Sequence, residues 1–302
     1  MKDALPIARR ADIGPFEAGR IAYGCWRFAG FAPHEAQAKI DAALAIGANL
    51  MDTAAVYGGT AGFGGAEKVL GDVIAGSPGL RDQIVLVTKG GIHPPIPYDS
   101  RAHTLINSCE ASLARLKTDR IDVFLIHRPD LLASYDEVAG ALTTLRADGK
   151  IRAAGVSNFS PAQIRALQSK LDFPLVATQP EFSPTCVGAL EDGSTDIAQE
   201  LGLALMAWSP LGGGRLVPGA RGEPGSVDAR VLAVLEEIAH RNEVGVDHAA
   251  LAWVLAHPAT GFALIGTQSP ERITASARAY DVQMTRRDWY AVLEAAKGTS
   301  MP

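Results

Sequence analysis

The stretch Asn49-Leu50-Met51-Asp52-Thr53-Ala54-Ala55-Val56-Tyr57-Gly58 joins a short apolar run to an acid and, five residues later, to a tyrosine. The run predicts a buried strand that ends at Asp52, with Tyr57 in the loop that leaves it. A carboxylate in an apolar setting needs a partner, because burying it alone costs several kcal/mol or shifts its pKa. Asp52 therefore predicts a polar or cationic partner nearby in the folded chain.

Two later apolar runs end in residues that could supply this partner. Residues 84–88 lead into Lys89, and residues 121–126 lead into His127. An acid, a tyrosine, a lysine and a histidine thus follow the ends of three consecutive predicted strands. One ionisable residue at a strand end is often structural, but four such groups at one rim predict an active site.

Short apolar runs alternate with amphipathic helical segments along the chain. The predicted strands cover residues 21–26, 49–52, 84–88, 121–127, 152–157, 175–179, 203–208 and 261–265. They are apolar throughout rather than alternating, which is typical of parallel strands buried on both faces. Eight such units predict a (β/α)8 barrel, the TIM-barrel fold, as a single domain over residues 1–302. In this fold the C-terminal strand ends converge on the face that carries active sites.

Some segments lie outside this repeat. Residues 1–20 mix charge with Gly and Pro and predict a short hairpin or lead-in, whereas residues 285–296 predict an additional C-terminal helix. Residues 215–227 form a Gly- and Pro-rich loop of a length that is usually functional. The rival fold, an open doubly wound sheet, would carry a G-x-G-x-x-G after its first strand. The chain has Trp26-Arg27-Phe28 there instead.

The composition limits the expected partners and compartment. A net charge of -5 over 302 residues gives no reason to expect nucleic acid or an anionic membrane as a partner. The three cysteines are far apart and form no C-x-x-C, which favours reduced thiols. The N-terminus has no signal-peptide core, and no apolar run reaches about 18 residues. We therefore expect a soluble cytoplasmic protein, with monomer and homodimer both open.

The chain resembles the aldo-keto reductase family, and closely its bacterial branch with an MAWSPLGGG-type seventh strand. The matching segments occur in family order and cover nearly the whole chain. They are Asp52-Thr53 with Tyr57-Gly58, Val87-Thr88-Lys89, Leu125-Ile126-His127-Arg128-Pro129, Gly155-Val156-Ser157-Asn158-Phe159, Gln179-Pro180-Glu181, Met206-Ala207-Trp208-Ser209-Pro210-Leu211 and Ile265-Gly266-Thr267 with Arg272. The resemblance implies NAD(P)H-dependent reduction of an aldehyde or ketone to an alcohol.

The resemblance also implies a catalytic tetrad of Asp52, Tyr57, Lys89 and His127. Tyr57 would be the general acid, assisted by Lys89 and Asp52, and His127 would position the carbonyl of a small substrate. A free tyrosine is a weak acid at neutral pH, because its pKa is about 10, and a nearby cation favours its phenolate. The four residue types therefore suit proton donation to a developing alkoxide.

The same resemblance implies a site for NADPH, with NADH as a possible alternative. The expected cofactor-binding residues are Gly24, Cys25, Trp26, Ser157, Asn158, Gln179, Trp208, Ser209, Leu211, Gly213, Gly266, Thr267, Gln268 and Arg272. Ser157, Asn158 and Gln179 would hold the nicotinamide carboxamide, and Trp208 would stack on the ring. Cys25 stands beside the nicotinamide, where Thr is common in relatives.

The phosphate end of the cofactor is expected at two loops. Residues 209–213 match the segment that holds the pyrophosphate, where glycines let backbone amides come close. Residues 266–268 and Arg272 match the segment that grips the 2′-phosphate, at a helix N-terminus, which favours NADPH. Relatives often place Glu-Asn where this chain has Ala275 and Ser276, so the adenine contact is left open.

Two other functions remain open from the residues. A metal-dependent hydrolase could use Asp52, His93, His127 and Lys89, although no H-x-H or H-E-x-x-H motif is present. A non-catalytic, nicotinamide-binding redox-sensing subunit would keep the cofactor site without turnover.

The Gly-rich residues 59–65 lack the Gly-Lys-Ser/Thr ending of a phosphate loop and predict a flexible rim segment. The expected aromatic pocket wall consists of Trp26, Phe28, Tyr57, His93 and Trp208.

Overall fold

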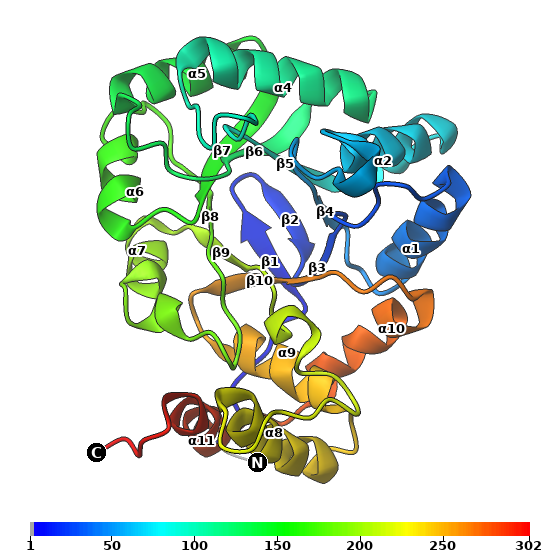
Figure 1. Ribbon diagram of the computed structural model, residues 1–302, viewed down its shortest axis with the longest axis vertical. Helices are drawn as coiled ribbons and strands as arrows, with labels where there is room; N and C mark the ends of the chain where they lie inside the picture. The colour runs from blue at the N-terminus through cyan, green and yellow to red at the C-terminus, as the bar shows by residue number, and fades with distance from the viewer. Residues whose placement is uncertain (1–2) are drawn as a thin grey trace.

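Eight parallel strands close into a barrel in the computed structural model, which describes residues 3–302 (Figure 1). The order around the barrel is β10-β3-β4-β5-β6-β7-β8-β9, so each strand lies beside its neighbour in sequence and the last pairs with the first. The bounds are β3 (Ile21–Gly24), β4 (Leu50–Asp52), β5 (Val85–Gly90), β6 (Ile121–Ile126), β7 (Ile151–Ser157), β8 (Ala177–Gln179), β9 (Ala204–Ala207) and β10 (Thr260–Ile265). The predicted (β/α)8 barrel is confirmed.

Helices surround the barrel and cover the outer face of its strands (Figure 1). Their bounds are α1 (Pro33–Ala45), α2 (Gly65–Gly76), α3 (Leu80–Gln83), α4 (Ala102–Leu116), α5 (Tyr135–Ala147), α6 (Pro161–Gln168), α7 (Ser194–Leu201), α8 (Val227–Arg241), α9 (Val246–Ala256), α10 (Pro270–Ala275) and α11 (Arg286–Lys297). The sequence did not predict α3, because four residues are too few for a helical period. Within the described residues, no helix has the length and apolar character needed to cross a membrane.

Local sequence signals explain where several helices begin. Ser160 caps α6, because its hydroxyl accepts the Gln163 amide at 3.3 Å while the Gln163 side chain accepts the Ser160 amide at 2.9 Å. Pro161 occupies the first helical position, where its missing N–H has no helical partner to lose. This reciprocal capping fixes the end of β7 and the loop that follows it.

A pair of tryptophans attaches the C-terminal helix to the barrel. Trp253 of α9 and Trp289 of α11 stack with ring centroids 5.0 Å apart. Each indole N–H donates to the backbone carbonyl of the other residue, at 2.9 and 3.1 Å. Helix α8 packs against both α9 and α11, so α8 and α11 form an outer layer beyond α9 (Figure 1). The predicted additional C-terminal helix is confirmed.

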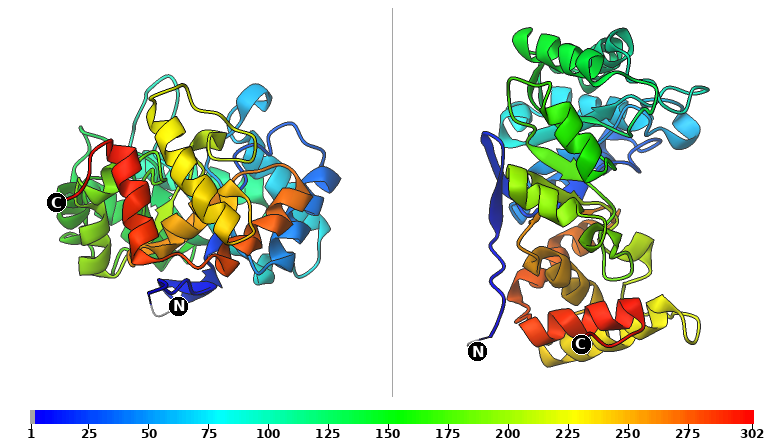
Figure 2. Two further views of the ribbon diagram at one scale, coloured as in Figure 1. Left: turned by 90° about the horizontal axis from the view of Figure 1, so that it is seen from below. Right: turned by 90° about the vertical axis from the view of Figure 1, so that its left-hand side faces the viewer.

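The predicted N-terminal hairpin is present and covers the N-terminal end of the barrel. Strands β1 (Arg10–Ile13) and β2 (Phe16–Gly19) pair antiparallel and lie flat along one side of the molecule (Figure 2). Their apolar side chains pack against those that fill the barrel interior. At the turn, Gly14 has φ +59°, and a side chain there would meet Val176 at 2.6 Å. With this end closed, the C-terminal strand ends form the open face of the barrel.

Candidate active site

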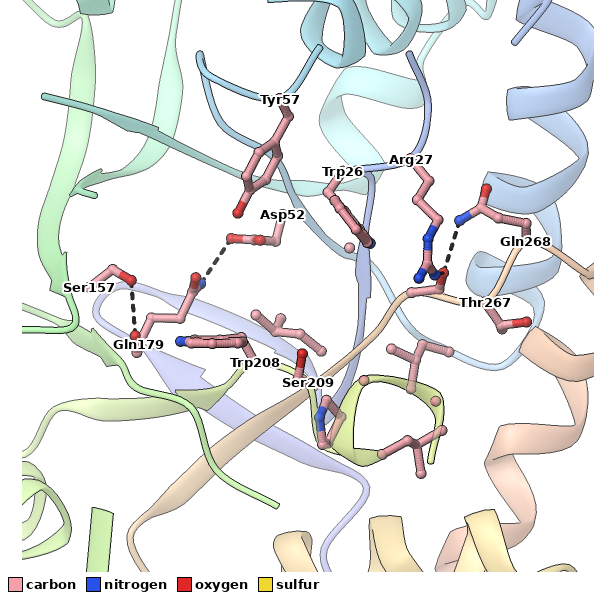
Figure 3. Close-up of a pocket in the computed structure, with 18 of the residues that line it drawn as sticks. Trp26, Arg27, Asp52, Tyr57, Ser157, Gln179, Trp208, Ser209, Thr267 and Gln268 are labelled. Carbon is pink, nitrogen blue, oxygen red and sulfur yellow. Dashed lines mark hydrogen bonds between the residues drawn. The ribbon is translucent and has the colours of Figure 1, made fainter. Parts of the chain in front are cut away.

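A cavity of about 760 Å³ opens at the C-terminal ends of the barrel strands (Figure 3). Most of the site residues predicted from the sequence line it. They are Gly24, Trp26, Asp52, Tyr57, His127, Ser157, Asn158, Gln179, Trp208, Ser209, Leu211, Gly213, Gly266, Thr267, Gln268 and Arg272. Two residues of the predicted tetrad and cofactor site do not: Lys89 lies buried behind Asp52 and Tyr57, and Cys25 lies in the core.

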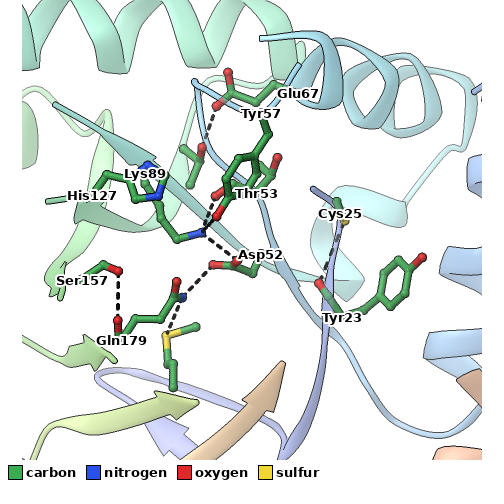
Figure 4. A network of polar contacts seen from close by, with 12 residues as sticks. Tyr23, Cys25, Asp52, Thr53, Tyr57, Glu67, Lys89, His127, Ser157 and Gln179 are labelled. Atoms are coloured by element: carbon green, nitrogen blue, oxygen red, sulfur yellow. Dashed lines mark hydrogen bonds and ion pairs between the residues drawn. The ribbon is translucent and has the colours of Figure 1, made fainter. Parts of the chain in front are cut away.

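Lys89 is completely buried at the centre of the predicted tetrad (Figure 4). Its ammonium group donates to Asp52 Oδ2 at 2.7 Å, to the Thr53 carbonyl at 2.8 Å and to the Tyr57 hydroxyl oxygen at 3.3 Å. Burial disfavours the charged form, but the Asp52 carboxylate and the Tyr57 oxygen outweigh it and raise the pKa of Lys89. Lys89 therefore remains a cation, with its three N–H donors satisfied.

The direction of these hydrogen bonds leaves the Tyr57 proton available. An ammonium group has only donors, so the Tyr57 oxygen accepts from Lys89 and keeps its own O–H. Among the side chains that the structure describes, none makes another hydrogen bond with the Tyr57 hydroxyl, and Tyr57 lines the cavity. The phenol can therefore donate its proton to an oxygen of a ligand in the cavity.

The main chain of Tyr57 is held by helix α2. The Ala66 amide at the start of α2 donates to the Tyr57 carbonyl at 2.9 Å. The next residue, Glu67, is completely buried and accepts from the Thr88 hydroxyl at 2.6 Å and from Arg115 at 2.7 Å. Thr88 precedes Lys89 on β5, so this buried carboxylate ties the loop that carries Tyr57 to the strand that carries Lys89.

A chain of hydrogen bonds extends from Asp52 to the opposite wall of the cavity (Figures 3 and 4). The side-chain amide of Gln179 donates to Asp52 Oδ1 at 2.9 Å. The Ser157 hydroxyl donates to the backbone carbonyl of Gln179, also at 2.9 Å. Asn158 donates to the Ser157 hydroxyl at 2.7 Å and accepts from the Trp208 indole at 3.1 Å. The residues predicted to hold the nicotinamide are thus linked to the predicted tetrad and fixed in orientation.

His127 faces Tyr57 edge-on, with ring centroids 5.6 Å apart. Burial, together with the cations of Lys89 and Arg128, lowers the pKa of His127 to about 3. The imidazole is therefore neutral at physiological pH and carries one proton. Nδ1 is buried without a partner among the described residues. Because a buried orphan N–H is rarer than a buried orphan acceptor, the proton belongs on Nε2.

The low pKa of His127 predicts a loss of stability in acid. Between pH 6.5 and 3 the unfolded chain binds a proton on this residue that the folded chain does not, so the free energy of unfolding falls as the pH falls. Neutral His127 contributes fully above pH 6.5, and about 3 kcal/mol of this contribution is expected to be lost by pH 4. Urea unfolding at pH 7, 5.5 and 4 should therefore show a steeper pH dependence in the wild type than in His127→Gln. Burial also lowers the pKa values of His248 and His257, but both residues are present in the wild type and in the variant, so their effect cancels. Equal pH dependence of the two proteins would therefore contradict the assignment to His127.

A glycine turn after β9 contains free backbone amides in residues that line the cavity. Gly212, Gly213 and Gly214 all have positive φ, a conformation that other residues rarely adopt. Within the described residues, the amides of Leu211 and Gly213 donate to no acceptor, and both residues line the cavity. Free amides at such a turn suit the oxygens of an anionic group.

The segment after β10 forms the other half of this wall. Gln268 donates to the Gly266 carbonyl at 2.9 Å, while its Oε1 atom is buried without a partner among residues 3–302. The Arg272 guanidinium is exposed at the cavity and makes no hydrogen bond or ion pair with any described residue. The helix N-terminus expected as an anion site is weaker than predicted, because α10 has six residues and the Ser269 side chain already accepts the Arg272 amide. The anion-binding capacity therefore rests on the Arg272 side chain.

Several residues predicted at the site lie elsewhere. The Cys25 side chain is buried in the core, and its amide and carbonyl already bond to Asp52 and Phe28 at 2.8 and 3.0 Å. Phe28, predicted in the pocket wall, is completely buried. His93 packs against Phe63, with ring centroids 5.7 Å apart, and does not line the cavity. Of the two residues at the doubtful adenine contact, Ala275 and Ser276, neither lines the cavity.

Two arginines that the sequence analysis did not assign also line the cavity. Arg27 donates to the Gly266 carbonyl at 2.9 Å and lies 4.5 Å over the Trp26 ring, so it bridges the loops after β3 and β10 (Figure 3). Arg128 directly follows His127. The one signal in the sequence that could have indicated Arg128 is its position next to a predicted active-site residue at a strand end.

The metal-dependent hydrolase hypothesis finds no ligand set. In the part of the chain that the structure describes, no group of three or more His, Cys, Asp or Glu side chains is arranged to hold a metal ion. The hypothesis would have used Asp52, His93, His127 and Lys89, and His93 lies outside the cavity lining.

The aldo/keto reductase family model matches residues 20–297, which include the whole barrel and the cavity. The chain belongs to the aldo-keto reductase family. It is therefore an oxidoreductase of a family that acts on carbonyl compounds. This agrees with the position of the cavity at the C-terminal strand ends, where the predicted tetrad residues meet.

Named relatives and a solved structure extend the comparison. A 6-dehydroglucose reductase from Novosphingobium aromaticivorans is 48% identical, covering 98% of this chain and 98% of the relative. A 6-dehydroglucose reductase from Agrobacterium fabrum is 40% identical, covering 97% of this chain and 99% of the relative. The crystal structure of a thermostable aldo-keto reductase with the inhibitor epalrestat matches with a TM-score of 0.81 at 26% identity, over 95% of this chain and 99% of that one.

Proposed function

We propose that this chain reduces an aldehyde to an alcohol with NADPH, and that Tyr57 is the general acid. The observation that carries the proposal is the hydrogen bond from the buried, cationic Lys89 to the Tyr57 oxygen, which leaves the phenolic proton free at the cavity. NADPH bound in the cavity would supply the hydride.

Residues of the chain then orient the carbonyl group and supply the proton. The Nε2–H group of His127 donates a hydrogen bond to the carbonyl oxygen, keeps its proton, and so orients and polarises the group. Tyr57 transfers its proton to the same oxygen as negative charge develops there. Lys89, held by Asp52, stabilises the tyrosinate that remains, because a buried cation at hydrogen-bond distance favours the phenolate.

The polar groups left free in the cavity fit NADPH. Trp208 offers an aromatic face held in place by Asn158. The unused amides of Leu211 and Gly213 suit the pyrophosphate. The Arg272 guanidinium suits the 2′-phosphate, because it makes no hydrogen bond or ion pair with any described residue.

For the substrate we propose 6-dehydroglucose, a glucose whose C6 hydroxyl is oxidised to an aldehyde. The support is the identity of 48% and 40% to two relatives that carry this name, each over almost the full length of both chains. The test is the fall in NADPH absorbance when purified protein is mixed with this sugar, with appearance of glucose as the product. Tight NADPH binding without turnover of this or any other carbonyl would instead favour the non-catalytic redox-sensing subunit.

The cofactor preference gives a further prediction. Replacing Arg272 by Met removes the charged fork from the proposed 2′-phosphate site, so NADPH affinity should fall about 10- to 100-fold while NADH affinity stays the same. Quenching of tryptophan fluorescence measures both, because Trp26 and Trp208 line the cavity. Arg278→Met is the matched control, since Arg278 bonds to the Glu243 carbonyl and does not line the cavity. An equal loss for both nucleotides would argue against the phosphate role.

A further inference from the structure

The cations that line the cavity are not balanced by acids. Arg27, Arg128 and Arg272 line it, whereas Asp52 is the acidic residue among the lining residues. Both carboxylate oxygens of Asp52 are already used inside the hydrogen-bond network, one of them by Lys89. The cavity is thus positively charged in a chain whose net charge is -5. Such a cavity suits ligands rich in oxygen acceptors.

Arg128 differs from Arg27 in having no partner. Arg27 already donates to a backbone carbonyl and stacks on Trp26. Arg128 is half-buried, and its guanidinium makes no hydrogen bond or ion pair with any of residues 3–302. The acid nearest to it in sequence, Asp130, uses both oxygens on backbone amides, at 2.9 Å each. The donors of Arg128 are therefore available to a ligand.

The barrel order separates Arg128 from the phosphate-binding wall. Arg128 follows β6 and Arg272 follows β10, and these strands stand four apart in either direction around the closed eight-stranded barrel. The glycine turn follows β9 and lies on the side of Arg272. Tyr57, Lys89 and His127 come from β4, β5 and β6 and the loops after them. Arg128 therefore lies with the groups that act on the carbonyl, across the cavity from those that suit the phosphates.

We propose that Arg128 binds acceptor oxygens of the substrate on carbons close to the reacting carbonyl, and so selects hydroxylated or carboxylated aldehydes over apolar ones. The inference rests on the proposed function, because it assigns a recognition role at the same site. A guanidinium presents its donors in a fixed fork that can engage two oxygens at once. His127, the preceding residue, engages the carbonyl oxygen, so Arg128 acts on the neighbouring part of the same molecule.

The experiment compares Arg128→Met with the wild type on aldehydes of matched length. Glyceraldehyde carries hydroxyls and propionaldehyde does not, while succinic semialdehyde carries a carboxylate and butyraldehyde does not. In Arg128→Met, kcat/KM for the two oxygen-rich aldehydes should fall about 10- to 100-fold, the effect of one charge-assisted hydrogen bond. For the two apolar aldehydes it should change by less than about threefold. A larger loss on glyceraldehyde assigns Arg128 to hydroxyls, and a larger loss on succinic semialdehyde assigns it to an anion.

Two further variants and a binding readout complete the design. Arg128→Lys, which keeps the charge without the fork, should recover part of the loss, and thermal melting verifies that both variants fold. The control is Arg120→Met, because Arg120 precedes the N-terminal end of the same strand and pairs with Asp82 at 2.5 Å, away from the cavity. Equal losses on oxygen-rich and apolar aldehydes, or no loss on any, would overturn the proposal.

Failure of the proposed function is visible separately, in the wild type. If wild-type protein reduces none of the four aldehydes, titration with succinic semialdehyde still tests Arg128 through tryptophan fluorescence. Saturable binding to the wild type that Arg128→Met lacks would support Arg128 as a binding residue without the reductase. Equal binding to both proteins, or binding to neither, would overturn its recognition role.

Discussion

Replacing Tyr57 by Phe should abolish aldehyde reduction while the protein stays folded and binds NADPH. The substitution removes a single oxygen, and that oxygen carries the proton that the hydrogen bond from Lys89 leaves free at the cavity. General acid catalysis contributes about 10²- to 10⁴-fold, so kcat should fall by at least this factor. The aromatic ring remains, and with it the edge-on contact to His127 at 5.6 Å. NADPH affinity, measured by fluorescence, should be nearly unchanged.

The control for this variant is Tyr290→Phe. Tyr290 lies on α11 and does not line the cavity, and its hydroxyl makes no hydrogen bond with the described residues. This variant should keep the wild-type kcat. Turnover retained in Tyr57→Phe would remove Tyr57 from the mechanism, whereas loss of both turnover and NADPH binding would indicate a role in shaping the cavity.

Replacing Lys89 by Met should cost both activity and stability. Lys89 is completely buried and Asp52 is 4% exposed, so the variant leaves a buried carboxylate without its cation. Breaking a buried ion pair from one side destabilises proteins by roughly 3–5 kcal/mol, and a similar loss in the free energy of unfolding is expected from urea titration. The proposed aldehyde reduction should slow as well, because no cation then lies at hydrogen-bond distance from the Tyr57 oxygen.

A double variant separates these two effects. In Lys89→Met with Asp52→Asn, the uncompensated charge is gone, so much of the lost stability should return while activity stays low. Lys170→Met provides the surface control, because Lys170 pairs with Asp136 in an exposed position where ion pairs contribute about 0–1 kcal/mol. If the double variant is as unstable as Lys89→Met alone, packing rather than the unpaired carboxylate explains the loss.

The sequence by itself determined the architecture and most of the cavity lining. Eight apolar runs separated by helical segments permit few arrangements, because parallel strands need helical crossovers and a barrel leaves no edge exposed. The C-terminal ends of such strands lie at the open face of the barrel. Asp52 and His127 were therefore predicted from their positions at strand ends, whereas Ser157 and Gln179 were implied by the resemblance to the family. Capping signals such as Ser160 located helices between the strands.

Only the tertiary structure decided which of several neighbouring side chains faces the cavity. Leu50 points into the barrel interior and Met51 into the outer layer, yet both are apolar, so the sequence carries no record of the difference. The same ambiguity applies to Cys25, whose side chain turns into the core while Trp26, the next residue, lines the cavity.

Charge pairing also depends on the tertiary structure. Arg115 forms an ion pair with the buried Glu67 of another helix. Arg128 forms no ion pair with any described residue. Whether a charged side chain is satisfied or free is set by residues far away in the sequence, because Coulomb and hydrogen-bond energies depend on distance in space. The sequence therefore determined where the site is, and the fold decided which of its groups remain free to act.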